Sequence, residues 1–243
     1  MSGGVIPGSD DPVYVRRQYA TEQGLRARKS VYTDVSGLDA REIAFEAVRD
    51  ADPARVLEVG CGEGELSERI VRGLGVELVA LDQSERMVEL ARARGVDARV
   101  GDVQELPFED GSFDVAVAAW MLYHVPDLDR AVGELARVLR PGGRLVAVTN
   151  RADHLGEMFK LVGVDRWELP FGAENGAEVL SRHFAHVEVE DATGTVTFAE
   201  AEQIRSYMRS SDRLAVYADL VPELDEPLVA RRRPVVFAAD DPR

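Results

Sequence analysis

Residues 55–149 contain five short apolar runs, most of them followed by a segment with helical periodicity. Each run is short and ends near glycine or a polar residue, which is typical of a buried parallel strand. Parallel strands need a crossover connection, usually a helix, on one face of the sheet. The pattern therefore predicts an α/β fold with a doubly wound, mostly parallel sheet and helices on both faces.

Capping residues mark where the helices of this region begin and end. Asp39, Ser84 and Asp127 each precede a helical pattern and are good N-caps. Gly95 and the Pro-Gly-Gly sequence at 141–143 are expected to end helices. The expected strands cover residues 56–59, 77–81, 98–100, 113–119 and 144–149.

The segments outside this core are less regular, and residues 1–12, rich in glycine and proline, are expected to form a loose tail. Residues 165–176 are expected to form a loop. The expected helices lie at 13–32, 39–50, 153–162, around 204–208 and at 213–221. The expected strands are 186–190, which 195–198 extends, and a last strand at 234–239.

The composition excludes several classes of protein. With 45% apolar side chains, the chain is too hydrophobic to be disordered. Its longest uncharged apolar run, residues 115–123, is far shorter than the roughly 20 residues that a membrane span needs. No basic and apolar leader opens the sequence, so we expect a cytoplasmic protein. The single cysteine, Cys61, excludes an intramolecular disulfide and a cysteine-built zinc site.

The charge balance argues against a nucleic-acid partner. Acidic residues number 44 against 29 basic ones, a net charge of −15 at pH 7, and such a surface repels phosphate backbones. The one tight basic cluster, residues 231–233, is expected to be a solvated segment just before the last strand. Only Lys29 and Lys160 are lysines, an arginine bias typical of a GC-rich bacterial genome.

The residues that carry chemistry follow the predicted strands, and ligands of open α/β sheets bind at the carboxyl ends of strands. The first strand runs into residues 58–64 (EVGCGEG), and the second ends at Asp82. The third ends at residues 101–103 (Gly-Asp-Val) and the fourth at Trp120, followed by Tyr123 and His124. This set predicts a ligand site at one edge of the sheet.

The glycine-rich loop favours a nucleoside ligand. Gly60, Gly62 and Gly64 allow backbone torsions and close approach that a Cβ would block, and the next helix presents free N–H groups. Asp82 lies 22 residues after Gly60, where an acidic side chain commonly binds ribose hydroxyls. Each feature alone also fits a packing turn or an ordinary loop acid. Their order and spacing together favour the binding site.

The loop differs from the dinucleotide fingerprint G-x-G-x-x-G, because its third glycine comes one residue early. Glu58 also stands two residues before Gly60. A buried carboxylate there would oppose a pyrophosphate but attract an ammonium or sulfonium group. The sequence therefore favours an amino-acid-bearing nucleoside over NAD.

The motif set resembles class I S-adenosylmethionine-dependent methyltransferases of the small-molecule type. The resemblance covers residues 40–150 well and 180–240 loosely, and it is specific for cofactor and fold but not for the acceptor. It implies a Rossmann-like, seven-stranded sheet whose last strand, at 234–239, runs antiparallel. The motifs are 58–64 (EVGCGEG), Asp82, 101–103 (GDV), 113–115 (FDV) and 139–143 (LRPGG).

The resemblance also implies which residues bind the cofactor, S-adenosyl-L-methionine. Residues 58–64, including Glu58, Gly60, Cys61, Gly62 and Gly64, would hold its methionine end. Asp82 would bind both ribose hydroxyls. Trp120 would border the sulfonium and face the acceptor. The adenine would lie among Gln83, Met87, Asp102 and the backbone N–H of Val103.

If the acceptor is a hydroxyl, a base should take its proton, and His124 is the first candidate. The alternative is a histidine that only closes the loop before Val125. Tyr123 and His154 are weaker candidates, and His183 and His186 are expected to be structural or exposed. No cluster with metal-ligand spacing follows the strands, so we expect no metal. Residues 119–122 (AWML) lack the Asn/Asp-Pro-Pro-aromatic motif of base methylation.

We therefore expect residues 1–38 to form a tail and lid helices, and residues 39–243 a class I methyltransferase domain. Insertions at about 151–183 and 199–230 would shape the acceptor pocket. The expected activity is methyl transfer to a small molecule, in bacterial specialised metabolism, with the oligomeric state open between monomer and homodimer. A non-catalytic, S-adenosylmethionine-binding regulator and, less favoured, an NAD-dependent oxidoreductase stay as alternatives.

Overall fold

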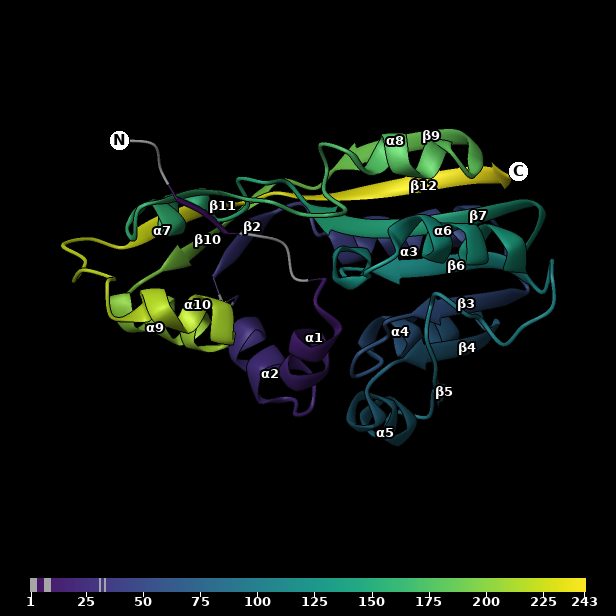
Figure 1. Cartoon of the computed structure of the whole chain (residues 1–243), viewed down its shortest axis with the longest axis horizontal. Coiled ribbons are helices and arrows are strands. Elements are labelled where there is room, and N and C mark those ends of the chain that lie inside the picture. Colours follow the sequence, from purple (N-terminus) through teal and green to yellow (C-terminus); the bar gives the residue numbers. More distant parts are fainter. Residues whose placement is uncertain (1–3, 7–9, 31, 33) are drawn as a thin grey trace.

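A seven-stranded sheet forms the centre of the computed structural model, which describes residues 4–6, 10–30, 32 and 34–243 (Figure 1). β3 to β7 run parallel, whereas β12 is antiparallel to both its neighbours, β7 and β9. This confirms the predicted Rossmann-like sheet with an antiparallel last strand. The order across the sheet is β5 (Asp97–Val100), β4 (Glu77–Asp82), β3 (Arg55–Val59), β6 (Phe113–Ala119), β7 (Leu139–Asn150), β12 (Pro234–Pro242) and β9 (Phe184–Asp191).

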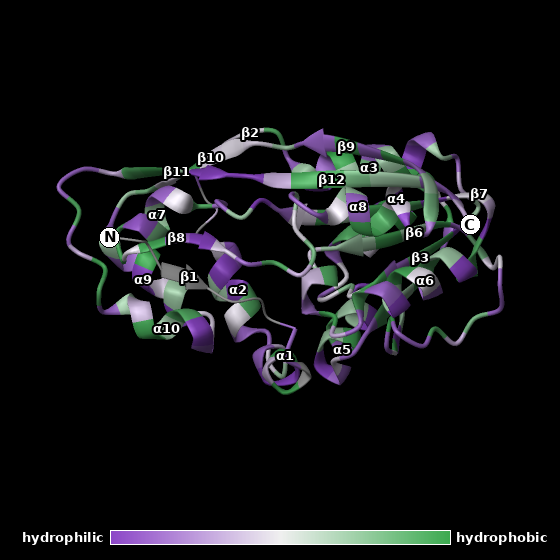
Figure 2. Ribbon diagram, turned by 45° about the horizontal axis from the view of Figure 1, so that its top comes forward, coloured by the Kyte–Doolittle hydropathy of each residue, from purple (hydrophilic) through white to green (hydrophobic). Residues whose placement is uncertain are grey.

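Helices cover both faces of this sheet because successive strand residues point to opposite sides. Leu57 packs on one face with α6 (Leu128–Val138) and α8 (Gly176–Ser181). Its neighbour Val56 packs on the other face. There it meets α3 (Ala40–Asp50), α4 (Glu65–Leu74) and α5 (Glu85–Ala93). Figure 2 shows hydrophobic residues concentrated along the central strands.

The predicted caps form, with one difference at the end of α6. The side chains of Asp39, Ser84 and Asp127 accept hydrogen bonds from backbone N–H groups at the start of α3, α5 and α6. The Pro-Gly-Gly sequence does not separate α6 from the next strand, because β7 already begins at Leu139. Leu139 is buried and pairs with Phe113, so extended backbone starts before the turn.

A second, smaller layer lies beyond the sheet. β10 (Gly194–Phe198) pairs antiparallel with β2 (Val35–Gly37) and β11 (Leu228–Arg232). The sequence analysis expected residues 195–198 to extend β9. That expectation was wrong, because these residues belong to a different sheet. Asp191 ends β9, and its carboxylate accepts the Thr193 N–H at 2.8 Å, which stabilises a turn between the two strands. α7 (Gly156–Lys160), α9 (Ala201–Arg209) and α10 (Asp212–Ala218) share an apolar core with this layer.

Three further expectations were wrong in part. β1 (Gly4–Ile6), within the expected tail, pairs in parallel with β8 (Val164–Trp167), which takes the first part of the expected 165–176 loop. The helix expected at 153–162 is only the short α7, preceded by turns. Arg231 and Arg232 belong to β11, and Arg232 donates to backbone carbonyls of the neighbouring strands rather than to solvent alone.

The N-terminal helices α1 (Pro12–Gln18) and α2 (Gln23–Ser30) lie between the two layers (Figure 1). On one side the Gln18 side chain donates to the Ser210 carbonyl at 2.7 Å, beside α9. On the other side Arg86 of α5 forms two hydrogen bonds of 3.0 Å with Glu22. These contacts place α1 and α2 across the gap between the layers.

Phe237 gives a test of the core. Its side chain is fully buried on β12 and contacts Phe171, so Phe237→Ala would leave a cavity. We expect a loss of about 3–5 kcal/mol in the free energy of unfolding, measured by urea denaturation. The control Val216→Ala changes a side chain that is 70% exposed and should cost little. A loss below about 1 kcal/mol for Phe237→Ala would contradict this packing.

Candidate active site

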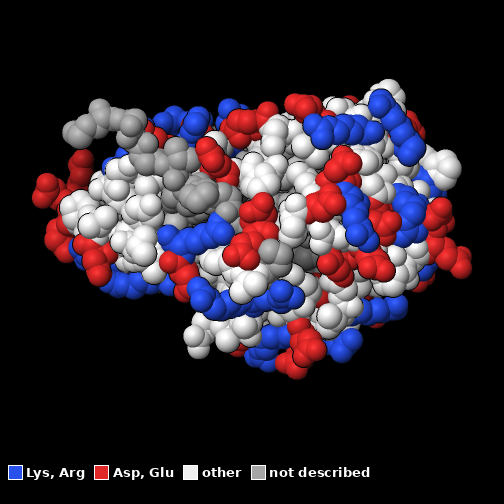
Figure 3. All heavy atoms as spheres, in the orientation of Figure 1, with Lys and Arg blue, Asp and Glu red and all other residues white. Residues whose placement is uncertain are grey.

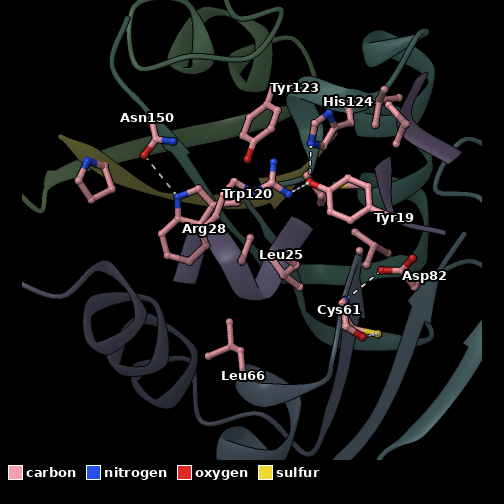
Figure 4. Close-up of a pocket in the computed structure, with 18 of the residues that line it drawn as sticks. Tyr19, Leu25, Arg28, Cys61, Leu66, Asp82, Trp120, Tyr123, His124 and Asn150 are labelled. Atoms are coloured by element: carbon pink, nitrogen blue, oxygen red, sulfur yellow. Dashed lines mark hydrogen bonds between the residues drawn. The ribbon is translucent and has the colours of Figure 1, made fainter. Parts of the chain in front are cut away.

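One cavity of about 740 Å³ opens at the carboxyl ends of β3, β4 and β6 (Figure 4). Its far walls come from α1, α2, α10 and β11, so it extends from the sheet to the smaller layer. This volume lies in the upper half of the range of about 300–1,000 Å³ that is usual for small-molecule sites. The cavity also lies where the strand order reverses, because β4 and β6 flank β3.

The glycine loop adopts the strained backbone that its composition predicts. Gly60, Gly62 and Gly64 have φ values of 65°, 53° and 76°, in the left-handed region. A Cβ on Gly60 would lie 2.6 Å from the Met121 Cβ. Gly60 and Gly62 line the cavity, whereas Gly64 does not. A Cβ on Gly64 would meet Ala91 at 2.8 Å, so this glycine allows α4 to pack against α5.

Glu58 is the most buried acid of the cavity wall. It lies on β3 and accepts a short hydrogen bond from Ser67 of α4. Burial raises its pKa to about 7, although the Ser67 hydrogen bond acts in the opposite direction. A carboxylate that is costly to ionise alone gains from a cationic ligand beside it. Glu58 therefore suits the ammonium or sulfonium end of the expected cofactor.

Asp82 connects the end of β4 to the glycine loop. Its two carboxylate oxygens accept the N–H groups of Gly62 and Ser84, each at 2.9 Å. Burial raises the pKa of Asp82, and these backbone hydrogen bonds oppose the shift. A carboxylate has about four acceptor positions, so the carboxylate keeps capacity to accept from a ribose hydroxyl.

The residues predicted around the adenine are only partly in the cavity wall. Gln83, Asp102 and Val103 line it, and Cys61 lines it beside the glycine loop. Burial raises the pKa of the Cys61 thiol, which leaves it a neutral wall residue. Met87 does not line the cavity, because its side chain on α5 is fully buried.

Trp120 marks the end of β6. Its backbone has a φ of 54°, a conformation that is rare for a large side chain and that recurs at functional sites. The indole N–H donates to the Asn150 side chain at 3.4 Å, and the Arg41 guanidinium lies 5.3 Å from the ring centre. Trp120 thus lines the cavity at the end of β6, and its place between cofactor and acceptor stays a prediction.

His124 contacts a residue that the sequence analysis did not connect to it. The Tyr19 hydroxyl lies 3.0 Å from the His124 Nε2, and the Arg28 guanidinium lies 3.4 Å from the same hydroxyl (Figure 4). Because an arginine only donates, the Tyr19 oxygen accepts from Arg28. The Tyr19 hydroxyl donates to His124 in the tautomer that carries the ring proton on Nδ1. Tyr123 packs edge-to-face against His124, and burial raises the Tyr123 pKa.

The other histidines take different roles. His154 lines the cavity, but its Nδ1 accepts the Arg233 N–H at 2.9 Å. Burial lowers its pKa to about 3, helped by the nearby Arg232 charge, so the ring is neutral with its proton on Nε2. His183 and His186 lie outside the cavity and face Asp129 and Asp241 at 3.1 and 3.8 Å.

Helix α2 contacts the glycine loop through charged groups. Arg26 and Lys29 of α2 donate to the two Glu63 carboxylate oxygens at 3.2 and 3.0 Å. Burial tends to raise the Glu63 pKa, but these two cations lower it overall. Ser84, at the start of α5, also donates to the Tyr19 carbonyl at 2.8 Å. α1 and α2 are therefore attached to both the first and the second strand end.

Several wall residues could not be located from the sequence. Tyr19 and Arg28 lie in the segment 13–32, which was expected only to be helical, and nothing in its sequence points them at His124. Asn150 and Tyr207 belong to no recognisable sequence motif.

In the described part of the chain, no group of three His, Cys, Asp or Glu side chains could hold a metal ion. Among the same residues, no helix is long and apolar enough to cross a membrane.

Known proteins resemble this chain in sequence and in fold. Residues 57–147 match the family model described as a methyltransferase domain. Over 107 residues, 41% of this chain and 44% of the relative, the sequence is 44% identical to the ubiquinone biosynthesis O-methyltransferase of Xanthomonas oryzae pv. oryzae. Over 99 residues, 37% of this chain and 36% of the relative, it is 43% identical to the 27-O-demethylrifamycin SV methyltransferase of Amycolatopsis mediterranei.

The chain spans less than half the length of either relative. The similarity to one solved structure extends over far more of this chain. The [4+2]-cyclase SpnF superimposes with a TM-score of 0.63 over 99% of this chain and 98% of its own, at 21% identity. This similarity concerns the fold alone. The family match assigns residues 57–147 to a methyltransferase domain, and the sheet order and the similarity to this solved structure agree with a Rossmann-like fold around it.

Asp82→Ala tests the ribose contact. Loss of the carboxylate should weaken the affinity for S-adenosylhomocysteine by about 1.5–3 kcal/mol, measured by calorimetry, because two hydrogen bonds to a charged group disappear. Asp97→Ala is a matched control, since Asp97 lies on the neighbouring strand outside the cavity wall. Unchanged affinity in Asp82→Ala would remove Asp82 from the site.

Glu58 predicts a pH dependence of cofactor affinity. Its pKa is about 7 without ligand, against an ordinary value of 4.5, so the side chain gains its negative charge between about pH 6 and pH 8. A cationic ligand binds the ionised form better, so affinity for S-adenosylmethionine should rise roughly fivefold to tenfold from pH 6 to pH 8. In Glu58→Gln this rise should vanish; a pH-independent affinity in the unaltered protein would contradict the assignment.

Proposed function

We propose that this protein transfers a methyl group from S-adenosylmethionine to a hydroxyl of a small-molecule acceptor. The observation that carries the proposal is the Tyr19 hydroxyl, 3.0 Å from the His124 Nε2 inside the cavity that Glu58 and Asp82 also line. An acid–base pair beside a cofactor pocket suits an acceptor that must lose a proton. Two relatives support the same reaction, because both are named methyltransferases and one is named an O-methyltransferase.

The residues of the cavity wall fit the cofactor at one end. Glu58 offers a carboxylate for a cation, Asp82 acceptor capacity for a ribose hydroxyl, and the glycine loop space without side chains. The cofactor, when bound, supplies an electrophilic methyl group on a sulfonium. Wall residues orient the acceptor oxygen in line with that group, and alignment alone can contribute several kcal/mol to rate enhancement.

Tyr19 and His124 then move the proton. The acceptor hydroxyl donates to the Tyr19 oxygen, and the Tyr19 proton passes to the His124 Nε2 as the oxygen–carbon bond forms. Arg28, 3.4 Å from the Tyr19 oxygen, stabilises negative charge that develops there. The products are the methylated acceptor, S-adenosylhomocysteine and a protonated histidine that returns its proton to water.

The parts of the chain are proposed to divide the work. Residues 39–243 form the catalytic domain, with residues 1–38 as a tail and lid. Two insertions, at about 151–183 and 199–230, form the acceptor side. His154 and Tyr207, which line the cavity from these insertions, support that division. The relative named 27-O-demethylrifamycin SV methyltransferase supports a role in specialised metabolism.

The surface supports a small molecule rather than a nucleic acid as the acceptor. On the face shown in Figure 3, blue and red side chains are interspersed and no broad basic patch is present. With a net charge of −15, such a surface does not attract a phosphate backbone.

Turnover of the acid–base pair is the direct test. In an assay of S-adenosylhomocysteine formation over a panel of phenolic and aliphatic hydroxyl acceptors, His124→Asn and Tyr19→Phe should lower kcat roughly 100- to 10,000-fold. Cofactor affinity should stay within about twofold, because neither side chain is assigned to the cofactor. His186→Asn and Tyr217→Phe, outside the cavity, are the matched controls.

Two outcomes would contradict the proposal. Cofactor binding without S-adenosylhomocysteine formation on any acceptor would favour the non-catalytic alternative; the cyclase fold shows that this architecture is not confined to methyl transfer. Full activity in both His124→Asn and Tyr19→Phe would remove the acid–base pair from the mechanism.

A further inference from the structure

The acids and the arginines of the cavity wall come mostly from different elements, although Lys29 of the wall pairs with Glu63 and Glu65. The carboxylates of the wall all lie between residues 39 and 102, at the start of α3 and at the ends of β3, β4 and β5. The far end of the cavity receives arginines from α2, α10 and β11, together with tyrosines. The acidic residues are Asp39, Glu58, Glu63, Glu65, Asp82 and Asp102. The cationic end contains Arg28, Arg213, Arg232, Tyr14, Tyr32 and Tyr207.

Arg28 is the arginine nearest to the acid–base pair. Its guanidinium donates to the Tyr19 hydroxyl at 3.4 Å and lies 5.6 Å from the Tyr19 ring centre. Within the described ranges, no carboxylate lies within ion-pair distance of it. Its other charged or polar neighbours are Tyr14, Tyr123 and Tyr207. A partly buried cation without a counter-ion is costly, and one tyrosine uses only one of its five N–H donors.

Arg232 is the second cation of this end. It donates to the carbonyls of Ser36 and Thr195 at 3.0 and 3.2 Å, which fix its side chain to the three-stranded sheet. No carboxylate of the described residues pairs with Arg232 either. Burial raises the pKa of Tyr32, and the charges of Arg232 and Arg28 both act to lower it. Tyr32 therefore lies within the electrostatic reach of both arginines.

Most other arginines of the described residues form ion pairs with acids, such as Arg144 with Asp240 at 2.7 Å and Arg86 with Glu22 at 3.0 Å. In a chain with a large excess of acidic residues, counter-ions for Arg28 and Arg232 are not scarce. The cavity instead leaves the Arg28 guanidinium on the Tyr19 hydroxyl and the Arg232 guanidinium on backbone carbonyls, neither with a carboxylate partner among the described residues.

We propose that the acceptor carries an anionic group, a carboxylate or a phosphate, which binds Arg28 as its main contact with Arg232 as a second cation. A guanidinium binds such groups through two parallel N–H bonds, and the tyrosine hydroxyls add further donors. Because Arg28 also touches the Tyr19 hydroxyl, the anionic group lies only a few bonds from the acceptor hydroxyl. This inference rests on the proposed function, since it describes the same site.

The test compares matched ligands on the complex with S-adenosylhomocysteine. Salicylate carries a carboxylate next to its hydroxyl, salicylamide is the neutral analogue, and phenyl phosphate carries the alternative anion. By calorimetry, at least one anion should bind roughly tenfold or more tightly than salicylamide. Comparison of salicylate with phenyl phosphate distinguishes a carboxylate from a phosphate acceptor.

Variants of the two arginines complete the experiment. Arg28→Gln should abolish the preference for the anion, Arg28→Lys should retain part of it, and Arg232→Gln should reduce it less. Affinity for S-adenosylhomocysteine should not change. Arg166→Gln is the matched control, because Arg166 is exposed on β8 and outside the cavity wall.

Three outcomes would overturn the inference. The first is that neither anion binds, and the second is that salicylamide binds as tightly as both anions. The third is that Arg28→Gln weakens the affinity for S-adenosylhomocysteine itself, which would assign Arg28 to the cofactor carboxylate. The proposed function fails separately. Methyl transfer to a neutral phenol such as catechol, with no anion preference, would keep the function and remove the anionic subsite. Anion binding without S-adenosylhomocysteine formation on any acceptor would keep the anionic subsite and remove the proposed function.

Discussion

The hydrogen bond from the Gly62 N–H to the Asp82 carboxylate, 2.9 Å long, is the contact on which the site depends. It joins the loop after β3 to the end of β4, and so fixes the glycine backbone next to an acid. Only glycine adopts the left-handed torsions of this loop at low cost, and Gly60 could not accept a Cβ beside Met121. The geometry of the cofactor end therefore follows from the local backbone.

The acceptor end depends instead on contacts between segments far apart in sequence. Tyr19 reaches His124 across more than a hundred residues, and it does so because α1 and α2 lie between the sheet and the smaller layer. Ion pairs to Glu63 and to Arg86 hold this segment against the sheet side. Arg28 of α2 lines the cavity as well, so these helices also form part of its wall.

Sequence alone predicted what local patterns encode. The alternation of strand and helix, the caps at Ser84 and Asp127, and the acids after β3 and β4 all depend on neighbours in the chain. The antiparallel β12 was also found, through family resemblance. The turn between β9 and β10 depends on a local hydrogen bond from the Thr193 N–H to the Asp191 carboxylate. The sheet that β10 joins depends on its pairing with β2 and β11, which lie far away in the sequence. No local pattern encodes that pairing.

The same limit applied to the site. Glu58, Gly60 and Asp82 line the cavity as their motifs indicate, whereas Met87 has a motif position but a fully buried side chain. Arg28 and Arg232 have ordinary sequence surroundings. Their importance lies in the missing carboxylate partners in the described chain, which only the folded arrangement reveals.

The most direct test of the central claim is a crystal structure of the complex with S-adenosylhomocysteine. The account predicts both ribose hydroxyls on the Asp82 carboxylate, the amino group beside Glu58, and the sulfur facing Tyr19 and His124. A nucleoside bound elsewhere, or one whose sulfur points away from Tyr19 and His124, would contradict it.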